Sequence, residues 1–329
     1  MVTRKFQQNL LTWFDSQARD LPWRQTSDPY RIWVSEIMLQ QTRVAAVLGY
    51  YKNFLSLFPT VNDLANATEA EVLAAWSGLG YYRRARYMHQ AAQAVVRDHH
   101  GIFPDTAEQL RALPGIGEYT SSAIASIAFG EPVAVVDGNV ERVLLRLYPG
   151  NPTNKWFREQ ANTLLDRERP GDFNQAMMEL GATVCLPQRP LCLHCPVQRF
   201  CGTRGEHETP PAKKMRSREI AYALLRRKNH VLLEQRSPQS SLMPGMWELP
   251  EVAMLDGDHE RLEITARHSI TVTNYSVSVL RFSETEIKER FPRGENPRRW
   301  VPGSELNSLP LTGLARKILR RLQILPHEV

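Results

Sequence analysis

All four cysteines of the 329-residue chain lie within one stretch of seventeen residues. Cys185, Cys192, Cys195 and Cys201 are spaced C-x6-C-x2-C-x5-C. This crowding predicts a metal site, because two disulfides between cysteines so close in sequence would be short and strained. Zinc usually binds two short C-x2-4-C pairs, whereas one short pair between two longer arms suits a [4Fe-4S] cluster. We therefore expect one iron-sulfur cluster, with zinc as the second interpretation and disulfides as the third.

A glutamate stands among large apolar residues near the N-terminus. Glu36 is flanked by Trp33 and Val34 on one side and by Ile37 and Met38 on the other. Burial among such side chains raises the pKa of a carboxyl group toward the range that suits a general acid. The alternative interpretation is a solvated helical stripe, since helical spacing from 36 to 43 places Glu36 on one face with Gln40 and Arg43.

A second carboxylate follows an apolar run. Asp137 comes directly after the four apolar residues 133–136 and precedes a helix that we expect to start near Val140. A turn or capping aspartate is one interpretation. The other is a catalytic carboxylate, partly removed from water and aimed by the end of the helix.

Two glycines separate a pair of predicted short helices. Gly115 and Gly117 lie between the predicted helices 107–113 and 121–129. Glycines so placed allow positive φ and leave room for backbone N–H groups and a helix N-terminus to face one phosphate. A plain turn between helices is the alternative.

The segment 78–86 places Tyr81 beside three arginines. This combination suits stacking and phosphate contact, or else a solvated helix face.

The hydrophobic periodicity changes once along the chain. It is helical from about residue 10 to 180, with breaks near prolines, and alternating or β-branched runs follow after residue 219. We expect an all-α domain over 1–203, a basic linker over 204–218 and a smaller α+β domain over 219–329. The predicted strands are 221–225, 231–235, 264–268 and 275–282, and the last predicted helix is 312–323.

Composition permits a polyanionic partner without demanding one. The formal net charge is +6, with 41 Lys and Arg against 35 Asp and Glu. No run of eighteen apolar residues occurs, and the N-terminal segment up to Asp20 has the pattern of an amphipathic helix, with Phe6, Leu10, Leu11 and Phe14 on one face. Because thiolate ligands also favour a reducing compartment, we expect a cytoplasmic protein that is associated with the nucleoid, as in bacteria, and has no membrane contact.

Several segments together resemble one family. They are SEIMLQQT (35–42), GLGYYRRAR (78–86), LPGIGEYTSSAI (113–124), VDGNVERV (136–143) and FNQAMMELGATVC (173–185), followed by the cysteine spacing. This combination resembles the helix-hairpin-helix DNA glycosylase superfamily, its endonuclease III-like branch with an iron-sulfur loop, and most closely the MutY family of adenine DNA glycosylases. A weaker likeness at 245–250 resembles the nudix-like C-terminal domain of that family. The implied fold is an all-α helix-hairpin-helix glycosylase domain with a [4Fe-4S] loop, followed by a smaller α+β nudix-like domain.

The resemblance also implies roles for individual residues. Glu36 would protonate the leaving adenine, Asp137 would stabilise an oxocarbenium-like sugar, and Tyr119 and Asn139 would position groups around them. Contacts to DNA, including a wedge at Gln40 and Tyr81, a grip on the backbone and recognition of the lesion, would come from Gln40, Tyr81, Gly115, Gly117, Arg24 and Thr271. The implied partner is double-stranded DNA with adenine opposite 8-oxoguanine or guanine, bound by a monomer.

Three departures from the family pattern bear on mechanism and specificity. Tyr119 occupies the hairpin position where strand-cutting relatives carry a lysine nucleophile, so we expect a monofunctional enzyme that uses water. Glu141 replaces a lysine that some members have after the Gly-Asn-Val. The Phe-Ser-His loop that contacts 8-oxoguanine in many members corresponds here to Ile270, Thr271 and Val272, and the glutamate-rich nudix box is missing.

Two other functions remain open from the sequence. One is a thymine or uracil mismatch glycosylase, which can also have tyrosine at the hairpin position. The other is a DNA-binding iron-sulfur protein without catalysis, against which the presence of both Glu36 and Asp137 argues.

Overall fold

The structure is a computed structural model that describes residues 2–150, 152–204, 214–270, 272–286 and 296–325. The chain forms two compact units, each interrupted in sequence. The first comprises Met1–Asn66 and Tyr87–Pro210, and the second comprises Ala67–Arg86 and Pro211–Val329. The range 67–86 therefore groups, by its contacts, with the C-terminal part of the chain.

The first unit is helical, as the periodicity predicts. Its helices are α1 (Val2–Gln17), α2 (Pro29–Leu39), α3 (Val44–Leu57), α4 (Val61–Asn66), most of α6 (Arg83–His99), α7 (Ala107–Arg111), α8 (Glu118–Phe129), α9 (Gly138–Leu147), α10 (Asn154–Leu164) and α11 (Pro170–Thr183). Short 3₁₀ turns lie at Pro22–Arg24, Cys192–His194 and Gln198–Phe200. The predicted all-α architecture of this part is confirmed.

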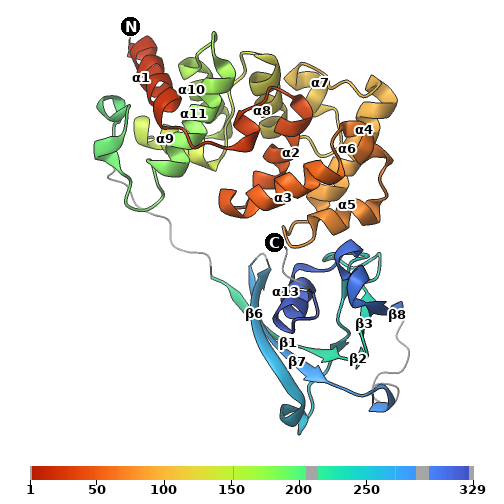
Figure 1. The fold of residues 1–329 in the computed structure, drawn as a ribbon. Coiled ribbons are helices and arrows are strands. Elements are labelled where there is room, and N and C mark those ends of the chain that lie inside the picture. Colours follow the sequence, from red (N-terminus) through yellow and green to blue (C-terminus); the bar gives the residue numbers. More distant parts are fainter. Residues whose placement is uncertain (1, 151, 205–213, 271, 287–295, 326–329) are drawn as a thin grey trace. The chain divides into compact units, whose positions relative to one another are not determined.

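The amphipathic α1 anchors α11, which carries part of the site described below. The four apolar residues predicted to share a face of α1 are all buried, namely Phe6, Leu10, Leu11 and Phe14. The ring of Phe6 lies 6.4 Å from that of Phe173 in α11. Each such side chain stabilises the fold by roughly 1.5–3 kcal/mol when it leaves water. Figure 1 shows α1, α10 and α11 gathered in this part of the unit, and both α10 and α11 contact α1.

One predicted helical face is wrong. Glu36, Gln40 and Arg43 do not share a face, because α2 ends at Leu39 and α3 begins only at Val44. Gln41 has φ +57°, in the left-handed region, which a continuous α-helix excludes. The segment contains neither glycine nor proline, so the periodicity gave no signal of the break. The break frees residues 40–43 to form a loop.

The second unit combines α5 (Glu69–Trp76) and α13 (Gly313–Arg321) with two four-stranded sheets. One sheet has the order β5-β1-β7-β6 and the other joins β2, β3, β4 and β8. The strands are β1 (Arg216–Leu224), β2 (Arg226–Arg227), β3 (His230–Gln235), β4 (Trp247–Glu248), β5 (Glu251–Val252), β6 (Leu262–Ile270), β7 (Thr273–Arg281) and β8 (Arg298–Pro302). Further 3₁₀ turns are Asp258–Arg261 and Gly303–Ser308. The four predicted strands and the last helix are all present.

The predicted linker ends earlier than its composition indicated. β1 begins at Arg216, whose backbone pairs in parallel with Thr273 of β7. The side chains of residues 216–219 are exposed, since they lie before the part of β1 that packs into the core. Charged residues are therefore compatible with a strand here, and residues 216–218 belong to the sheet instead of the linker.

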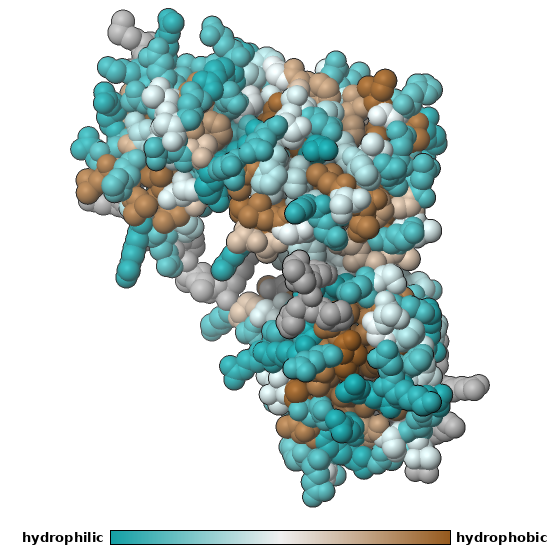
Figure 2. Space-filling view, in the orientation of Figure 1, coloured by the Kyte–Doolittle hydropathy of each residue, from teal (hydrophilic) through white to brown (hydrophobic). Residues whose placement is uncertain are grey.

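Hydrophilic residues cover most of the face drawn in Figure 2, and apolar residues reach the surface in scattered groups. The most exposed large apolar side chains among the described residues are Leu193 and Ile102, at 91% and 72%. No helix in the described ranges combines the length and the apolar character that a membrane crossing needs.

Candidate active site

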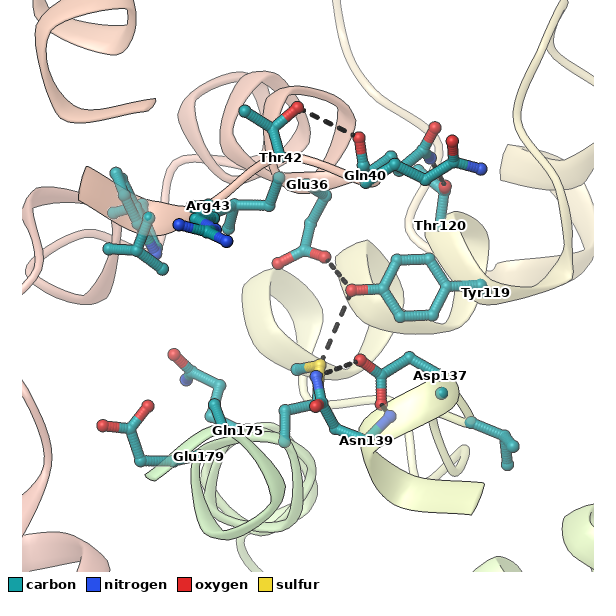
Figure 3. Close-up of a pocket in the computed structure, with 18 of the residues that line it drawn as sticks. Glu36, Gln40, Thr42, Arg43, Tyr119, Thr120, Asp137, Asn139, Gln175 and Glu179 are labelled. Atoms are coloured by element: carbon teal, nitrogen blue, oxygen red, sulfur yellow. Dashed lines mark hydrogen bonds between the residues drawn. The ribbon is translucent and has the colours of Figure 1, made fainter. Parts of the chain in front are cut away.

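A cavity of about 1430 Å³ in the first unit brings together most of the predicted site residues. It lies among α2, α8, α11 and the first turn of α9, and Figure 3 shows the side chains that reach into it. The predicted residues that line it are Arg24, Glu36, Gln40, Gly115, Gly117, Tyr119, Asp137 and Asn139. Residues up to 115 positions apart in sequence thus meet at one site.

Glu36 is a buried carboxylic acid at the wall of this cavity. Its residue is 5% exposed, because Trp33, Val34, Ile37 and Met38 are buried with it in α2. This burial raises the pKa of Glu36 to about 7, and the negative charge of Asp137 contributes in the same direction. Glu36 is therefore largely protonated below neutral pH, as the sequence predicted from its apolar neighbours.

The hydroxyl of Tyr119 connects α8 to Glu36. It donates a hydrogen bond of 2.5 Å to Oε2 of Glu36, and it lies 3.5 Å from Sδ of Met178 (Figure 3). Burial, together with the nearby carboxylates, holds the pKa of Tyr119 well above its usual range. Tyr119 is thus a hydroxyl donor at all physiological pH values, and it moderates the rise in the pKa of Glu36.

Asp137 occupies a position that is compatible with both interpretations of its sequence context. It is the N-cap of α9, where Oδ1 accepts hydrogen bonds from the backbone N–H groups of Asn139 and Val140, at 2.9 and 2.8 Å. It also lines the cavity, with its carboxylate turned toward the side on which Glu36 and Tyr119 lie (Figure 3). The helix N-terminus therefore fixes the direction of this carboxylate.

Asn139 extends the contacts of Asp137 toward the cysteine segment. Its Nδ2 donates to Oδ2 of Asp137 at 2.8 Å, and its Oδ1 accepts from Nη2 of Arg142 at 2.9 Å. Arg142 in turn donates from Nε to the carbonyl oxygen of Cys185 at 2.8 Å. Asn139 therefore holds the carboxylate in place, and Arg142 is a contact that sequence reasoning missed.

The helical hairpin has the expected turn, with one difference. Gly115 has φ +71°, and a Cβ there would lie 2.4 Å from Cβ of Tyr87, so only glycine fits. Gly117 is the extended N-cap of α8, with φ −88°, so the positive φ that glycine allows is used at Gly115 and not at Gly117. A Cβ on Gly117 would meet nothing within 4 Å, which leaves open space in front of the N-terminus of α8.

The other wall of the cavity holds a buried ion-pair network that sequence reasoning missed. Glu179 of α11 is 1% exposed, and its Oε2 accepts from Arg19 and from Arg24, both at 2.7 Å. These bonds hold the pKa of Glu179 to about 2 despite its burial. Gln175 lies one turn earlier and also lines the cavity. The i, i+4 spacing of these two polar residues, just before the first cysteine, is the sequence signal that could have found them.

Two predicted DNA contacts lie outside the cavity. Tyr81 belongs to the second unit and is 47% exposed, with the Arg84 guanidinium 5.2 Å from its ring centroid. Thr271 lies outside the described residues, but its neighbours form the tip of the β6–β7 hairpin, in which Ile270 pairs with Thr273. Gln40 does line the cavity, and its Nε2 donates to Oγ1 of Thr120 at 3.2 Å.

The four cysteines surround one small space. All of them are free thiols, and they line a cavity of about 30 Å³ after the end of α11. In the described residues, no group of three or more His, Cys, Asp or Glu side chains is arranged around a single metal ion. Tetrahedral zinc requires four donors within about 2.3 Å of one point. Four thiols around one shared space are the donor set that an iron-sulfur cluster requires.

A buried arginine faces this space. Arg146, at the end of α9, is 3% exposed, and its Nη1 lies 3.0 Å from Sγ of Cys185. A backbone N–H group, that of Arg204, also donates to Sγ of Cys201, at 3.2 Å. Such donors stabilise thiolates, which are the form that binds iron. The donor set and its surroundings therefore fit an iron-sulfur cluster.

Comparison with known proteins defines the class of protein first. Residues 34–166 match the model of the HhH-GPD superfamily base excision DNA repair proteins, and residues 221–321 match that of the NUDIX domain. A thermostable thymine-DNA glycosylase of known structure is 31% identical, with a TM-score of 0.58 over 61% of this chain and 96% of that one. An endonuclease III–DNA complex, 23% identical with a TM-score of 0.54, shows the same fold.

Sequence relatives narrow the class to one family. An adenine DNA glycosylase of Buchnera aphidicola (strain Bp) is 36% identical over 72% of this chain and 71% of its own length. The rat adenine DNA glycosylase is 52% identical over 60% of this chain, and the Arabidopsis thaliana one is 39% identical over 87%. The chain belongs to the adenine DNA glycosylase family. The match spans 41% of the length of the rat relative and 52% of the Arabidopsis one.

Proposed function

We propose that the protein is a monofunctional adenine DNA glycosylase that hydrolyses the N-glycosidic bond of adenine opposite 8-oxoguanine or guanine in double-stranded DNA. One observation supports this most strongly: a buried acid, Glu36, and a helix-capping carboxylate, Asp137, line the same cavity. A base must leave the duplex to reach such a cavity, and base flipping is how glycosylases present their substrates. Membership of the adenine DNA glycosylase family supports adenine as that base.

Glu36 supplies the proton that the leaving base needs. Adenine departs poorly as an anion, so an acid must protonate a ring nitrogen as the bond breaks. Oε2 of Glu36 accepts from Tyr119, which leaves Oε1 to carry the proton toward the base. With a pKa of about 7, Glu36 is protonated in a useful fraction of molecules at neutral pH and can take a proton from water afterwards.

Asp137 supplies the negative charge that the sugar needs. As the base leaves, positive charge develops on the deoxyribose, and a carboxylate held by three hydrogen bonds requires no reorganisation to stabilise it. None of the described residues that line the cavity is a lysine. An attack by water, without a Schiff base, is therefore the route that this lining supports.

The cofactor that we propose is one [4Fe-4S] cluster held by Cys185, Cys192, Cys195 and Cys201. When bound, it would supply a rigid cross-link between the end of α11 and the segment that follows it, with no part in the hydrolysis. Arg146 would contact the thiolate of Cys185, and the backbone of Arg204 that of Cys201.

We propose that the first unit grips the DNA strand and that the second contributes to recognition of the opposite base. Gly115 and Gly117 would place backbone N–H groups of the hairpin against a phosphate, while Gln40 and Tyr81 would enter the duplex. The tip of the β6–β7 hairpin, around Ile270 and Val272, would contact the 8-oxoguanine, because it corresponds to the Phe-Ser-His loop of family members.

A set of four duplexes tests the proposal. The full chain is incubated in excess over DNA containing A opposite 8-oxoguanine, A opposite G, T opposite G, or A opposite T, and alkali then cleaves abasic sites. We expect excision of adenine from the first two only. Excision of thymine alone would support the second candidate, which the likeness to a thymine-DNA glycosylase structure favours. Binding without any excision would indicate a non-catalytic DNA-binding protein.

A further inference from the structure

Asn174 in α11 is a buried amide whose hydrogen-bonding groups all face one segment and one neighbouring helix. It is 2% exposed and does not line the cavity, although the next residue, Gln175, does. Its Oδ1 accepts from the backbone N–H of Val135 at 3.0 Å. Its Nδ2 donates to the carbonyl oxygen of Val133 at 2.8 Å and to Oγ of Ser126 at 2.9 Å.

The segment that Asn174 contacts leads directly to Asp137. Residues 131–137 connect α8 to α9 and belong to neither a helix nor a strand. A side-chain amide has the same donor and acceptor as a peptide group, so Asn174 takes the place of a neighbouring strand for Val133 and Val135. Two-point bonding of this kind fixes the backbone conformation two residues before Asp137.

α11 also holds both flanks of this segment by close packing. A Cβ on Gly171 would lie 2.7 Å from the carbonyl oxygen of Ser126, near the end of α8. A Cβ on Gly181 would lie 2.6 Å from Cβ of Asn139, in the first turn of α9. The two glycines therefore let α11 approach α8 and α9 closely, and Asn174 bonds to the connection between them.

We propose that Asn174 is a positioning residue for Asp137. It fixes the path of residues 133–135, so that α9 starts at the point where its N-cap carboxylate faces Glu36 across the cavity. This inference rests on the proposed role of Asp137 in excision. A displacement of about 1 Å in such a group lowers a rate by about 100-fold, without a matching loss in substrate binding.

The test compares three variants of the full chain under single-turnover conditions. Asn174→Leu keeps the number and branching of the side-chain heavy atoms but loses all three bonds, and we expect an excision rate about 100-fold lower, with affinity for an abasic-site duplex within about threefold of wild type. Asn174→Asp keeps the shape and the acceptor for Val135, loses the donor to Val133, and should be at least about tenfold slower at pH 8. Ser126→Ala is the matched control, because it removes only the third partner, and it should stay within about threefold.

The pH profile separates positioning from general loosening of the fold. In Asn174→Leu the residual rate should still fall above about pH 7, since Glu36 remains buried.

An Asn174→Leu or Asn174→Asp rate within threefold of wild type would overturn the inference. So would a loss of duplex affinity equal to the loss of rate. If Asn174→Leu fails to fold, Asn174→Asp decides the question. Failure of the wild type to excise adenine would instead reject the proposed function.

Discussion

The hydroxyl of Tyr119 donates its hydrogen bond to Oε2 of Glu36 across 83 positions of sequence, at 2.5 Å. The bond joins α8, which begins directly after the hairpin turn, to the interior of α2. It occupies one carboxyl oxygen, Oε2, and leaves Oε1 for the proposed transfer of a proton to the base. The helical hairpin and the proposed acid are therefore mechanically connected.

Excision should decline as the pH rises through neutrality. In the proposed mechanism Glu36 acts in its protonated form, and burial raises its pKa to about 7, so the active fraction falls about tenfold per pH unit well above that value. Single-turnover rates between pH 5 and 9 would show the midpoint. A rate that stays constant from pH 6 to 9 would remove Glu36 as the acid.

Glu36→Gln should stabilise the fold at alkaline pH while abolishing excision. The pKa of Glu36 is higher in the folded protein than its ordinary value of 4.5, so the folded state binds the extra proton and loses stability as the pH rises from about 4.5 to 7. This rise in the pKa of Glu36 corresponds to about 3 kcal/mol of folding stability that is lost above pH 7. Thermal unfolding of both proteins at pH 5 and pH 8 would show a difference that grows with pH. Equal differences at the two pH values would contradict the assignment.

Tyr119→Phe should slow excision and move its pH dependence. The hydrogen bond from Tyr119 lowers the pKa of Glu36, so its loss moves the alkaline midpoint to higher pH. We expect a rate about tenfold lower at neutral pH, as for the loss of one hydrogen bond to a buried carboxyl group. The same single-turnover series measures both effects. A midpoint that moves to lower pH would be inconsistent with this geometry.

Asp137→Asn should preserve the N-cap of α9 and abolish excision. An asparagine oxygen can still accept from the N–H groups of Asn139 and Val140, so the stability of α9 should be preserved. The negative charge is lost, and we expect excision to fall by at least about 1000-fold with duplex binding retained. Gel-shift affinity and melting temperature serve as controls. A variant with more than a tenth of the wild-type rate would remove Asp137 from the mechanism.

The cysteine site should contain iron and sulfide. Protein purified without oxygen should hold about four iron and four sulfide atoms per chain, with the broad visible absorbance of such clusters. Arg146→Met should lower cluster retention on exposure to a chelator, because the bond to Sγ of Cys185 is lost. Arg199→Met, which removes an exposed arginine between Cys195 and Cys201, is the control. One equivalent of zinc and no sulfide would instead support the second interpretation of the spacing.

Two of the candidate site residues, Glu36 and Asp137, could be predicted from their immediate neighbours in the sequence. The apolar neighbours of Glu36 and the apolar run before Asp137 lie within a few residues of the groups that they influence. Both effects therefore appear in the linear sequence. The family resemblance added Tyr119 and Asn139. In the structure Tyr119 donates a hydrogen bond to Glu36, and Asn139 donates one to Asp137.

The features that could not be predicted depend on contacts distant in sequence. Glu179 bonds to Arg19 and Arg24 over 155 to 160 positions, and Asn174 bonds to residues about 40 positions away. The end of α2 at Leu39 has no capping residue to reveal it. Contacts of these kinds arise only when helices pack, so hydrophobic periodicity does not predict them.

The interrupted second unit sets an order of events during synthesis. Its α5 region precedes its strands in the chain, and the hydroxyl of Ser77 donates to the carbonyl oxygen of Leu311, 234 positions later. At about 5–20 residues per second, a ribosome needs roughly 10 to 50 seconds to make that distance. Residues 67–86 therefore leave the ribosome long before their partners exist. The second unit can close only after Leu311 has been made, so a chain truncated before Leu311 would leave this segment without its native neighbours.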